Sequence, residues 1–229
     1  MILHRPAAER GHADHGWLKT AHTFSFADYH DPAWMGFGSL RVINEDRIAG
    51  KKGFGPHPHR DMEILTYVLT GALEHQDSMG NGSVIRPNHL QYMSAGTGVM
   101  HSEINPENEE VHLLQIWIEP DTRGLPPRYA EKELGTLTPG VLQLIASENG
   151  GAESIVVRQK MRLYRGITRP GDKIVFSSQP GRIQWIQVIE GNLGIDSVSL
   201  QAGDGCGVTA EPLFTITTTK NAHFLLFDL

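Results

Sequence analysis

Turn-forming residues divide this chain into many short apolar runs, and that division restricts it to a β-rich fold. The 229 residues include 25 glycines and 13 prolines, and the runs between them are rich in β-branched or aromatic side chains, as in strands. Such runs are too short or too alternating for helices. Five of them are "SLRVIN" (39–44), "EILTYVL" (63–69), "HLLQIWI" (112–118), "RIQWIQVI" (182–189) and "HFLLFDL" (223–229). Only residues 8–18 and 127–134 have a moderately helical pattern, so we predict an all-β chain with few short helices.

A weak internal repeat predicts two related domains. Residues 67–81 read as a strand, a glycine turn and a second strand, and residues 187–205 follow the same plan about 120 residues later. A repeat of this size indicates two related β-barrels. We expect an N-terminal barrel at 1–125, a polar linker with proline and glycine at 126–140, and a C-terminal barrel at 141–229.

Charge and cysteine content exclude several classes of protein. The formal net charge is −6, which opposes direct binding to nucleic acid or to an anionic membrane. A single cysteine, Cys206, excludes an intramolecular disulfide and a cysteine-rich zinc site. The start of the chain lacks the apolar core of a signal peptide, and no run approaches the length of a membrane span. A cytoplasmic protein is expected, and a monomer, because two fused barrels cover each other's edges.

Two short motifs contain the residues expected to bind a metal ion. In "GFGPHPHRDMEI" (53–64), His57 and His59 are two residues apart, so they share one face of an extended strand, and Glu63 has the same parity. In "GTGVMHSEIN" (96–105), His101 and Glu103 repeat this spacing. A lone pair of histidines is more often a surface feature than a metal site, but two antiparallel strands that each offer a pair of donors can surround one ion.

Three imidazoles and one carboxylate suit a divalent transition metal such as Fe, Mn, Ni, Co, Cu or Zn. Four protein ligands leave positions open on an octahedral ion, as catalysis requires and a structural zinc site does not. The spacing alone does not decide whether Glu63 or Glu103 is the carboxylate ligand. Glu63 begins an apolar strand, and Glu103 is equally placed to lie at the rim.

Both motifs resemble those of the cupin superfamily, and their details resemble its pirin family. The resemblance is strong over the first 120 residues or so and includes "HPHRDMEI", "EHQDSMGN" and "QYMSAGTGVMHSE"; it is weaker in the C-terminal half. The sequence departs from the cupin pattern where Gly96 replaces a proline. The resemblance implies two cupin barrels with one metal in the first, held by His57, His59, His101 and Glu103, and it gives Glu63 a supporting role. The second barrel fits this expectation, since His223 is the sole histidine after His112.

The nearest resemblance is to the bacterial pirin-like quercetinases, which implies a 2,3-dioxygenase. Such an enzyme opens the ring of a flavonol with O₂ and releases carbon monoxide. Glu103 is then a ligand, and the sequence leaves open whether it is only a ligand or also the base that accepts the hydroxyl proton. Iron is the first metal to consider. Two alternatives remain open: a redox-sensitive regulator that acts through protein partners, as the animal pirins imply, and a cupin oxidoreductase with another substrate.

Other side chains are expected to have ordinary structural roles before functional ones. His75 and Asp77 share parity, either at the mouth of the barrel or at an exposed strand end, and Cys206 is expected to be a small buried hydrophobe. Core packing is expected for Phe54, Met62 and Met93, and turn, cap or surface roles for His12, His15, His22 and His30.

Overall fold

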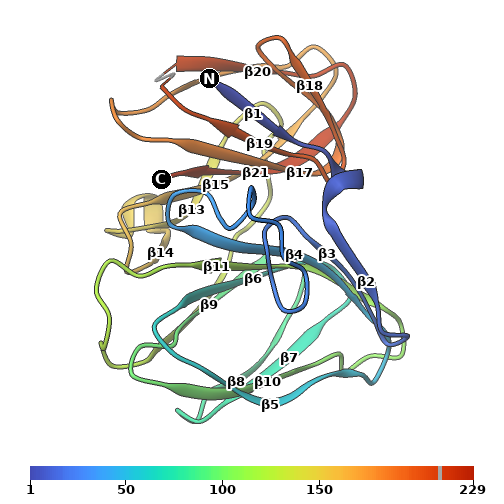
Figure 1. Cartoon of the computed structure of the whole chain (residues 1–229), viewed down its shortest axis with the longest axis vertical. Coiled ribbons are helices and arrows are strands. Elements are labelled where there is room, and N and C mark those ends of the chain that lie inside the picture. The colour runs from blue at the N-terminus through green and yellow to red at the C-terminus, as the bar shows by residue number, and fades with distance from the viewer. Residues whose placement is uncertain (211–212) are drawn as a thin grey trace. The chain divides into compact units, whose positions relative to one another are not determined.

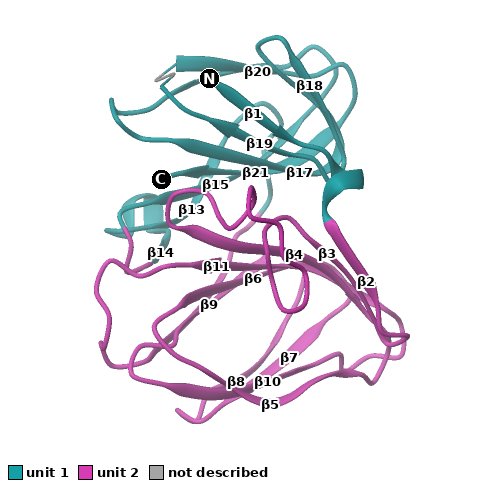
Figure 2. Ribbon diagram, viewed as in Figure 1, with its two compact units in different colours: residues 1–10, 136–156, 160–229 teal, residues 11–135, 157–159 magenta. Residues whose placement is uncertain are grey.

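The computed structural model describes residues 1–210 and 213–229, and nearly all of its regular structure is β-strand (Figure 1). This confirms the predicted all-β class. The described helices are single 3₁₀ turns, η1 (Ala7–Glu9) and η2 (Gly151–Glu153). Across the described residues, no helix is long and apolar enough to cross a membrane. The chain forms two compact units, coloured separately in Figure 2.

Unit 2 consists of residues 11–135 and 157–159 and contains two antiparallel sheets. The smaller sheet has the order β5-β10-β7-β8, and the larger has the order β12-β9-β6-β11-β4-β3-β2. The strands are β2 (Gly11–Asp14), β3 (Leu18–His22), β4 (Leu40–Ile48), β5 (Gly53–His59), β6 (Glu63–Thr70), β7 (Leu73–Asp77), β8 (Gly82–Ile85), β9 (His89–Ser94), β10 (Val99–Ile104), β11 (Val111–Ile118) and β12 (Arg128–Glu133).

Unit 1 consists of residues 1–10, 136–156 and 160–229. Its main sheet has the order β1-β19-β17-β21-β15-β13-β14, and β16, β18 and β20 join it through β17. The strands are β1 (Ile2–Arg5), β13 (Gln143–Ser147), β14 (Ile155–Val156), β15 (Arg162–Thr168), β16 (Lys173–Ser177), β17 (Gln184–Ile195), β18 (Val198–Gln201), β19 (Gly205–Val208), β20 (Leu213–Thr217) and β21 (Ala222–Asp228).

The units differ from the predicted domain boundaries at both ends of the first barrel. Residues 1–10 belong with the C-terminal half, because β1 pairs with β19 along its whole length. The predicted linker 126–140 contains β12, which extends the larger sheet of unit 2 by pairing with β9. Neither helix-like stretch is an α-helix. Residues 8–18 contain the end of η1, β2 and the first residue of β3, and residues 127–134 contain β12. In both stretches, pairing with a neighbouring strand outweighs a weak helical pattern.

The predicted internal repeat corresponds to one structural device in the two units. In unit 2 the chain leaves the larger sheet at the end of β6, turns at Gly71 and enters the smaller sheet as β7. In unit 1, β17 changes partners after Gly191, from β19 and β21 to β18 and β20. Both glycines have positive φ, 77° and 76°, and a Cβ at Gly191 would lie 1.7 Å from the carbonyl oxygen of Asn221. Glycine is therefore required at each crossing.

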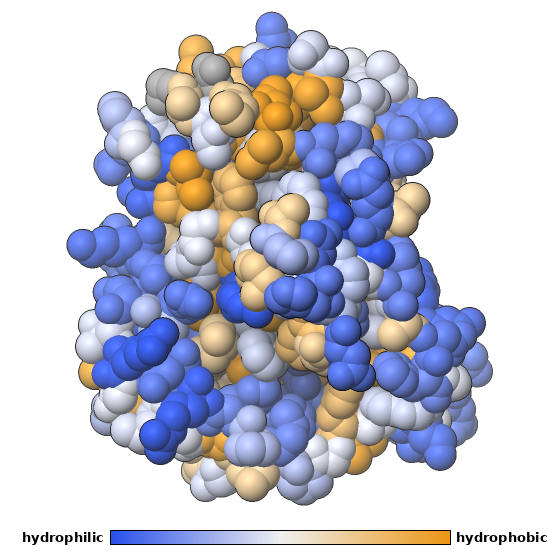
Figure 3. Space-filling view, viewed as in Figure 1, coloured by the Kyte–Doolittle hydropathy of each residue, from blue (hydrophilic) through white to orange (hydrophobic). Residues whose placement is uncertain are grey.

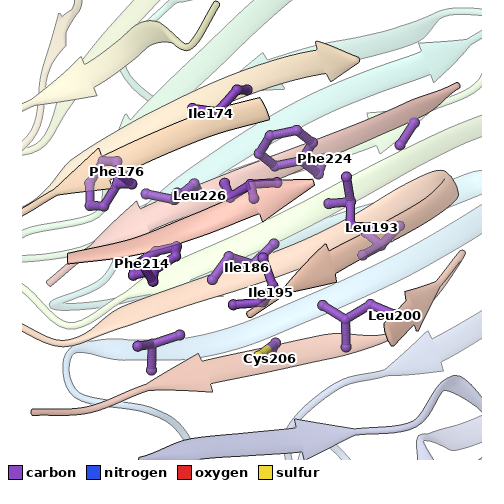
Figure 4. Packing of buried hydrophobic residues seen from close by; sticks show 14 residues of the cluster. Ile174, Phe176, Ile186, Leu193, Ile195, Leu200, Cys206, Phe214, Phe224 and Leu226 are labelled. Atoms are coloured by element: carbon purple, nitrogen blue, oxygen red, sulfur yellow. The ribbon is translucent and has the colours of Figure 1, made fainter. Parts of the chain in front are cut away.

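Each unit has its own apolar core. Figure 4 shows part of the unit 1 cluster, to which Phe224, Leu226, Ile186, Phe214 and Cys206 all belong. Cys206 is fully buried, as predicted, and burial raises the pKa of its thiol to about 12. Hydrophilic residues cover much of the face in Figure 3, and its main apolar area lies over the unit 1 strands around β1 and β20.

Candidate metal centre

The pairing of β5 with β10 brings the two histidine motifs together in unit 2. In this antiparallel register His101 lies opposite His57, and Val99 lies opposite His59. One ring nitrogen from each histidine takes part in a cluster whose atoms all lie within 4.8 Å of one another. The ring centroids are 4.4 Å apart for His57 and His101, 4.7 Å for His59 and His101, and 4.8 Å for His57 and His59. Three imidazoles at this spacing are a donor set for a divalent transition metal.

Burial keeps the imidazoles of His59 and His101 uncharged. It lowers the pKa of His101 to about 2, with further lowering from His57, His59 and His75, and it lowers the pKa of His59 to about 4, with His57 adding to the effect. The neutral ring has the lone pair that binds a metal. His101 is 2% exposed, and its Nε2 is a buried nitrogen with no hydrogen-bond partner among the described residues. Such an orphaned atom is rare in a folded protein, and a metal ion at the cluster would give it a partner.

Glu103 lies two residues beyond His101 on β10, and its side chain reaches strands of the larger sheet. Its Oε2 accepts a hydrogen bond of 2.7 Å from Gln115 Nε2 on β11, and its Oε1 accepts a longer one of 3.5 Å from Thr66 on β6. Trp117 Nε1 donates to Gln115 Oε1 at 3.2 Å, so a row of hydrogen bonds runs from Trp117 through Gln115 to Glu103. Burial raises the pKa of the Glu103 carboxyl to about 7 despite these hydrogen bonds.

The carboxylate of Glu103 does not belong to the cluster of three histidines. A ligand atom of Glu103 forms a second cluster within 4.8 Å, together with His75 and His101. A shift in pairing register separates His101 from Glu103 on β10. Glu103 therefore lies beside His101, with its oxygens held by Gln115 and Thr66.

Glu63 lies apart from both clusters, although its parity along the chain matches that of His57 and His59. Asp61 has a φ of 47° in the turn between β5 and β6, so the parity argument does not extend across it. The buried Glu63 carboxylate accepts hydrogen bonds from the Tyr92 hydroxyl, from Ser94 Oγ at 2.6 Å and from the Arg158 backbone N–H at 3.1 Å. Glu63 thus connects residues 157–159 to the larger sheet.

A cavity of about 290 Å³ opens directly onto the candidate site. His57, His59 and Glu103 lie on its wall, and Gln115 is among its lining residues. Much of the remaining wall is aromatic or aliphatic: Leu18, Phe26, Phe54 and Trp117. The Trp117 ring meets His59 edge-on, with centroids 4.8 Å apart. Thr20, Asn44 and Asp46 are also among the lining residues. A cavity that combines apolar walls with polar groups is the usual form of a small-molecule site.

The remaining candidates divide between cavity wall, core and interior. His15 and His22 line the cavity, and His22 Nδ1 lies 2.7 Å from Asn44 Oδ1. Met93 is buried and Met62 packs against it, as predicted, whereas Phe54 both packs on the core and faces the cavity. His75 and Asp77 are neither at the mouth nor at an exposed strand end, because both side chains are fully buried.

Sequence reasoning missed the three residues that hold or flank Glu103: Thr66, Gln115 and Trp117. Gln115 and Trp117 are two apart in "HLLQIWI", so alternation in that strand was the available signal, but their partner is on another strand. Both metal-type clusters among the described residues lie in unit 2.

Comparison with known proteins covers the whole chain. The family model for Pirin matches residues 4–118, and the model for the quercetinase C-terminal cupin domain matches residues 144–229. The quercetin 2,3-dioxygenase of Escherichia coli K12 is 47% identical over 230 residues, which span 100% of this chain and 99% of that protein. A pirin-like protein of Caulobacter vibrioides is 39% identical, with 100% and 99% coverage. The crystal structure of the E. coli pirin YhhW in complex with nickel(II) has a TM-score of 0.96 at 47% identity, with 100% and 99% coverage.

Removal of a cluster histidine is expected to weaken metal binding strongly. We predict that His101→Ala weakens Ni(II) binding by more than the roughly 10–100-fold typical of a change outside the ligand set. His89→Ala is the matched control, since His89 pairs with Glu131 on the β9–β12 edge and touches neither cluster. Competition with a chelator of known affinity measures both. Equal affinity in His101→Ala and His89→Ala would show that the histidine cluster is not the site.

The stability of the metal-free protein is expected to depend on Glu103 in a defined pH window. The pKa of Glu103 in the folded chain is about 7, above the usual 4.5, so folding favours the protonated carboxyl. The contribution of this carboxyl to the free energy of unfolding is therefore complete below pH 4.5 and is lost as the pH rises to 7. The free energy of unfolding of wild type minus that of Glu103→Gln should therefore fall across the window by about 3 kcal/mol. Urea unfolding with a chelator present measures it. A difference that is flat with pH would contradict the raised pKa.

Proposed function

Because the chain belongs to the pirin family, we propose that it is a metal-dependent dioxygenase that opens the ring of a flavonol such as quercetin with O₂ and releases carbon monoxide. The observation that carries the proposal is the cavity whose lining combines Phe26, Phe54 and Trp117 with His57, His59 and Glu103. A flat polyphenol matches that chemistry, since its rings suit the aromatic walls and its hydroxyls suit the polar lining residues. The E. coli relative named quercetin 2,3-dioxygenase supports the same activity.

We assign His57, His59, His101 and Glu103 as the ligands of one divalent transition metal. When bound, such an ion lowers the pKa of a coordinated hydroxyl and holds an electron-rich substrate in position for O₂. His59 and His101 supply neutral donors, because burial already keeps both unprotonated. Iron is the first metal we would test, and nickel the second, because the E. coli pirin was crystallised with nickel(II).

Glu103 has a second role in this proposal, as the base that takes the proton of the flavonol hydroxyl. A carboxyl with a pKa of about 7 can accept a proton and release it again near neutral pH. Gln115 holds one carboxylate oxygen and Thr66 the other, so the group has a defined direction. Phe26, Phe54 and Trp117 line the same cavity and offer apolar surface to a flat ring.

Turnover of a flavonol by the metal-loaded protein tests the activity. We expect protein loaded with Fe, Mn, Ni, Co or Cu to bleach the visible absorption of quercetin only when O₂ is present. Each flavonol consumed should use one O₂ and release one carbon monoxide, and both gases can be measured. If the protein binds these metals but turns over quercetin with none of them, the proposal is contradicted, and a regulator or an enzyme with another substrate is favoured.

The base role predicts a separation of metal binding from turnover. Glu103→Gln keeps the size of the side chain and should retain some metal, but turnover per bound metal should fall by roughly 10²–10⁴-fold. Glu74→Gln on β7 is the matched control, since Glu74 is partly exposed and pairs with Gln76. Metal occupancy is measured on the same samples as kcat. Full activity per metal in Glu103→Gln would exclude the base role.

A further inference from the structure

A row of buried polar side chains lies behind His101, on the side away from His57 and His59. It begins at Asp77 and runs through His75, and both are on β7, which pairs with β10. Asp77 Oδ2 lies 3.2 Å from His75 Nε2, and His75 Nδ1 lies 3.4 Å from His101 Nδ1. The side chains of His75 and Asp77 are both 0% exposed. Polar groups this deeply buried are costly unless each hydrogen bond is made.

The direction of these hydrogen bonds follows from the Asp77 end. Asp77 Oδ1 accepts the backbone N–H groups of Met79 at 2.9 Å and Asn81 at 3.0 Å, and the Asn81 side chain donates to Oδ2 at 2.9 Å. These donors outweigh burial, which by itself would raise the pKa of Asp77, and the net shift is downward. The carboxylate is thus ionised and only accepts, so the proton shared with His75 is on His75 Nε2.

A neutral histidine with its proton on Nε2 has a bare Nδ1. His75 Nδ1 must therefore accept, and the partner that donates to it is His101 Nδ1. His101 in turn has a bare Nε2, the same buried atom that lacks a hydrogen-bond partner among the described residues. Its lone pair is then free for a metal.

His57 achieves the same result with a backbone group. Its Nδ1 lies 2.8 Å from the carbonyl oxygen of Gly55, which only accepts, so the proton is on Nδ1 and Nε2 is bare. For His101 the corresponding acceptor is His75 Nδ1, which can accept only while Asp77 keeps the proton of His75 on Nε2. Substitutions at His75 or Asp77 should therefore change the tautomer of His101.

The His75 ring is itself held in position. Tyr129 on β12 stacks on it, with centroids 5.2 Å apart and an angle of 28° between the planes. The Tyr129 hydroxyl lies 2.6 Å from Ser83 Oγ on β8. Stacking on one face and the Asp77 hydrogen bond at one edge leave the ring little freedom to turn.

We propose that Asp77 and His75 are positioning residues of the metal centre, which hold His101 in the tautomer whose bare Nε2 faces the metal. The inference deepens the proposed function and rests on its metal site, but not on its substrate. It assigns a role to two buried residues that do not line the cavity. It also gives His75 a different role from direct ligation, although a ligand atom of His75 lies within 4.8 Å of those of His101 and Glu103.

Asp77→Asn tests the tautomer directly. The backbone N–H groups of Met79 and Asn81 retain the amide oxygen in the place of Oδ1, so the new NH₂ faces His75 Nε2 and reverses both hydrogen bonds. His101 should then carry its proton on Nε2. Nitrogen-15 NMR of the histidines in the metal-free chain reads this change, and Ni(II) affinity should fall by roughly 10–100-fold.

Asp14→Asn is the matched control for this experiment. Asp14 also accepts a backbone N–H two residues on, that of Gly16 at 2.8 Å, but it is exposed. It should leave both the His101 tautomer and the Ni(II) affinity unchanged. An Asp77→Asn protein with the wild-type tautomer and an affinity like that of Asp14→Asn would overturn the proposal.

Two substitutions at His75 keep the proposal falsifiable if Asp77→Asn fails to fold. His75→Asn places an amide oxygen near the former Nδ1, so it still accepts from His101 and should retain most of the Ni(II) affinity. His75→Leu removes the acceptor and should lose it roughly 10–100-fold. An equal loss in the two variants would mean that His75 is a ligand. Neither NMR nor Ni(II) affinity depends on flavonol turnover, so a failed quercetin assay leaves this test intact.

Discussion

The antiparallel pairing of β5 with β10 is the constraint on which the candidate site depends. Its register sets His101 opposite His57, and the two-residue period of each strand turns His59 to the same interior. A slip of one residue would turn the imidazoles of one strand to the outside. β7 pairs with the other edge of β10 and brings His75 beside His101. One small sheet thus supplies the donors and the residues behind them, while the larger sheet supplies Gln115 and Thr66.

Burial has opposite effects on the two kinds of group in this interior. It favours the neutral form of each, so it lowers the pKa of His59 and His101 and raises that of Glu103. The result is a set of imidazoles that are ready to bind a metal and a carboxyl that exchanges its proton near neutral pH. The same burial makes any unformed hydrogen bond around the site costly in free energy. The hydrogen bonds through His75 to Asp77 therefore set the tautomer of His101.

Unit 1 repeats the fold of unit 2, but its described residues contain no comparable set of metal donors. Gly71 and Gly191 make the same crossing in the two units, yet the interior of unit 1 is filled by an apolar cluster that includes Cys206. Fold and site are therefore separable in this chain. The barrel plan comes from short strands and glycine crossings, whereas the chemistry comes from a few interior positions on one small sheet.

The sequence by itself determined the all-β class, the repeat and the pairing of two histidine motifs, because strand alternation and turn residues are local properties. Family resemblance, and not spacing, favoured Glu103 over Glu63. Tertiary structure decided what local patterns do not contain: Asp61 breaks the parity that linked Glu63 to the histidines, and β1 joins the distant C-terminal unit. It also decided that Gln115 holds Glu103, and that Asp77 and His75 lie behind His101. Those contacts join different strands, and their direction depends on burial and on which atoms donate.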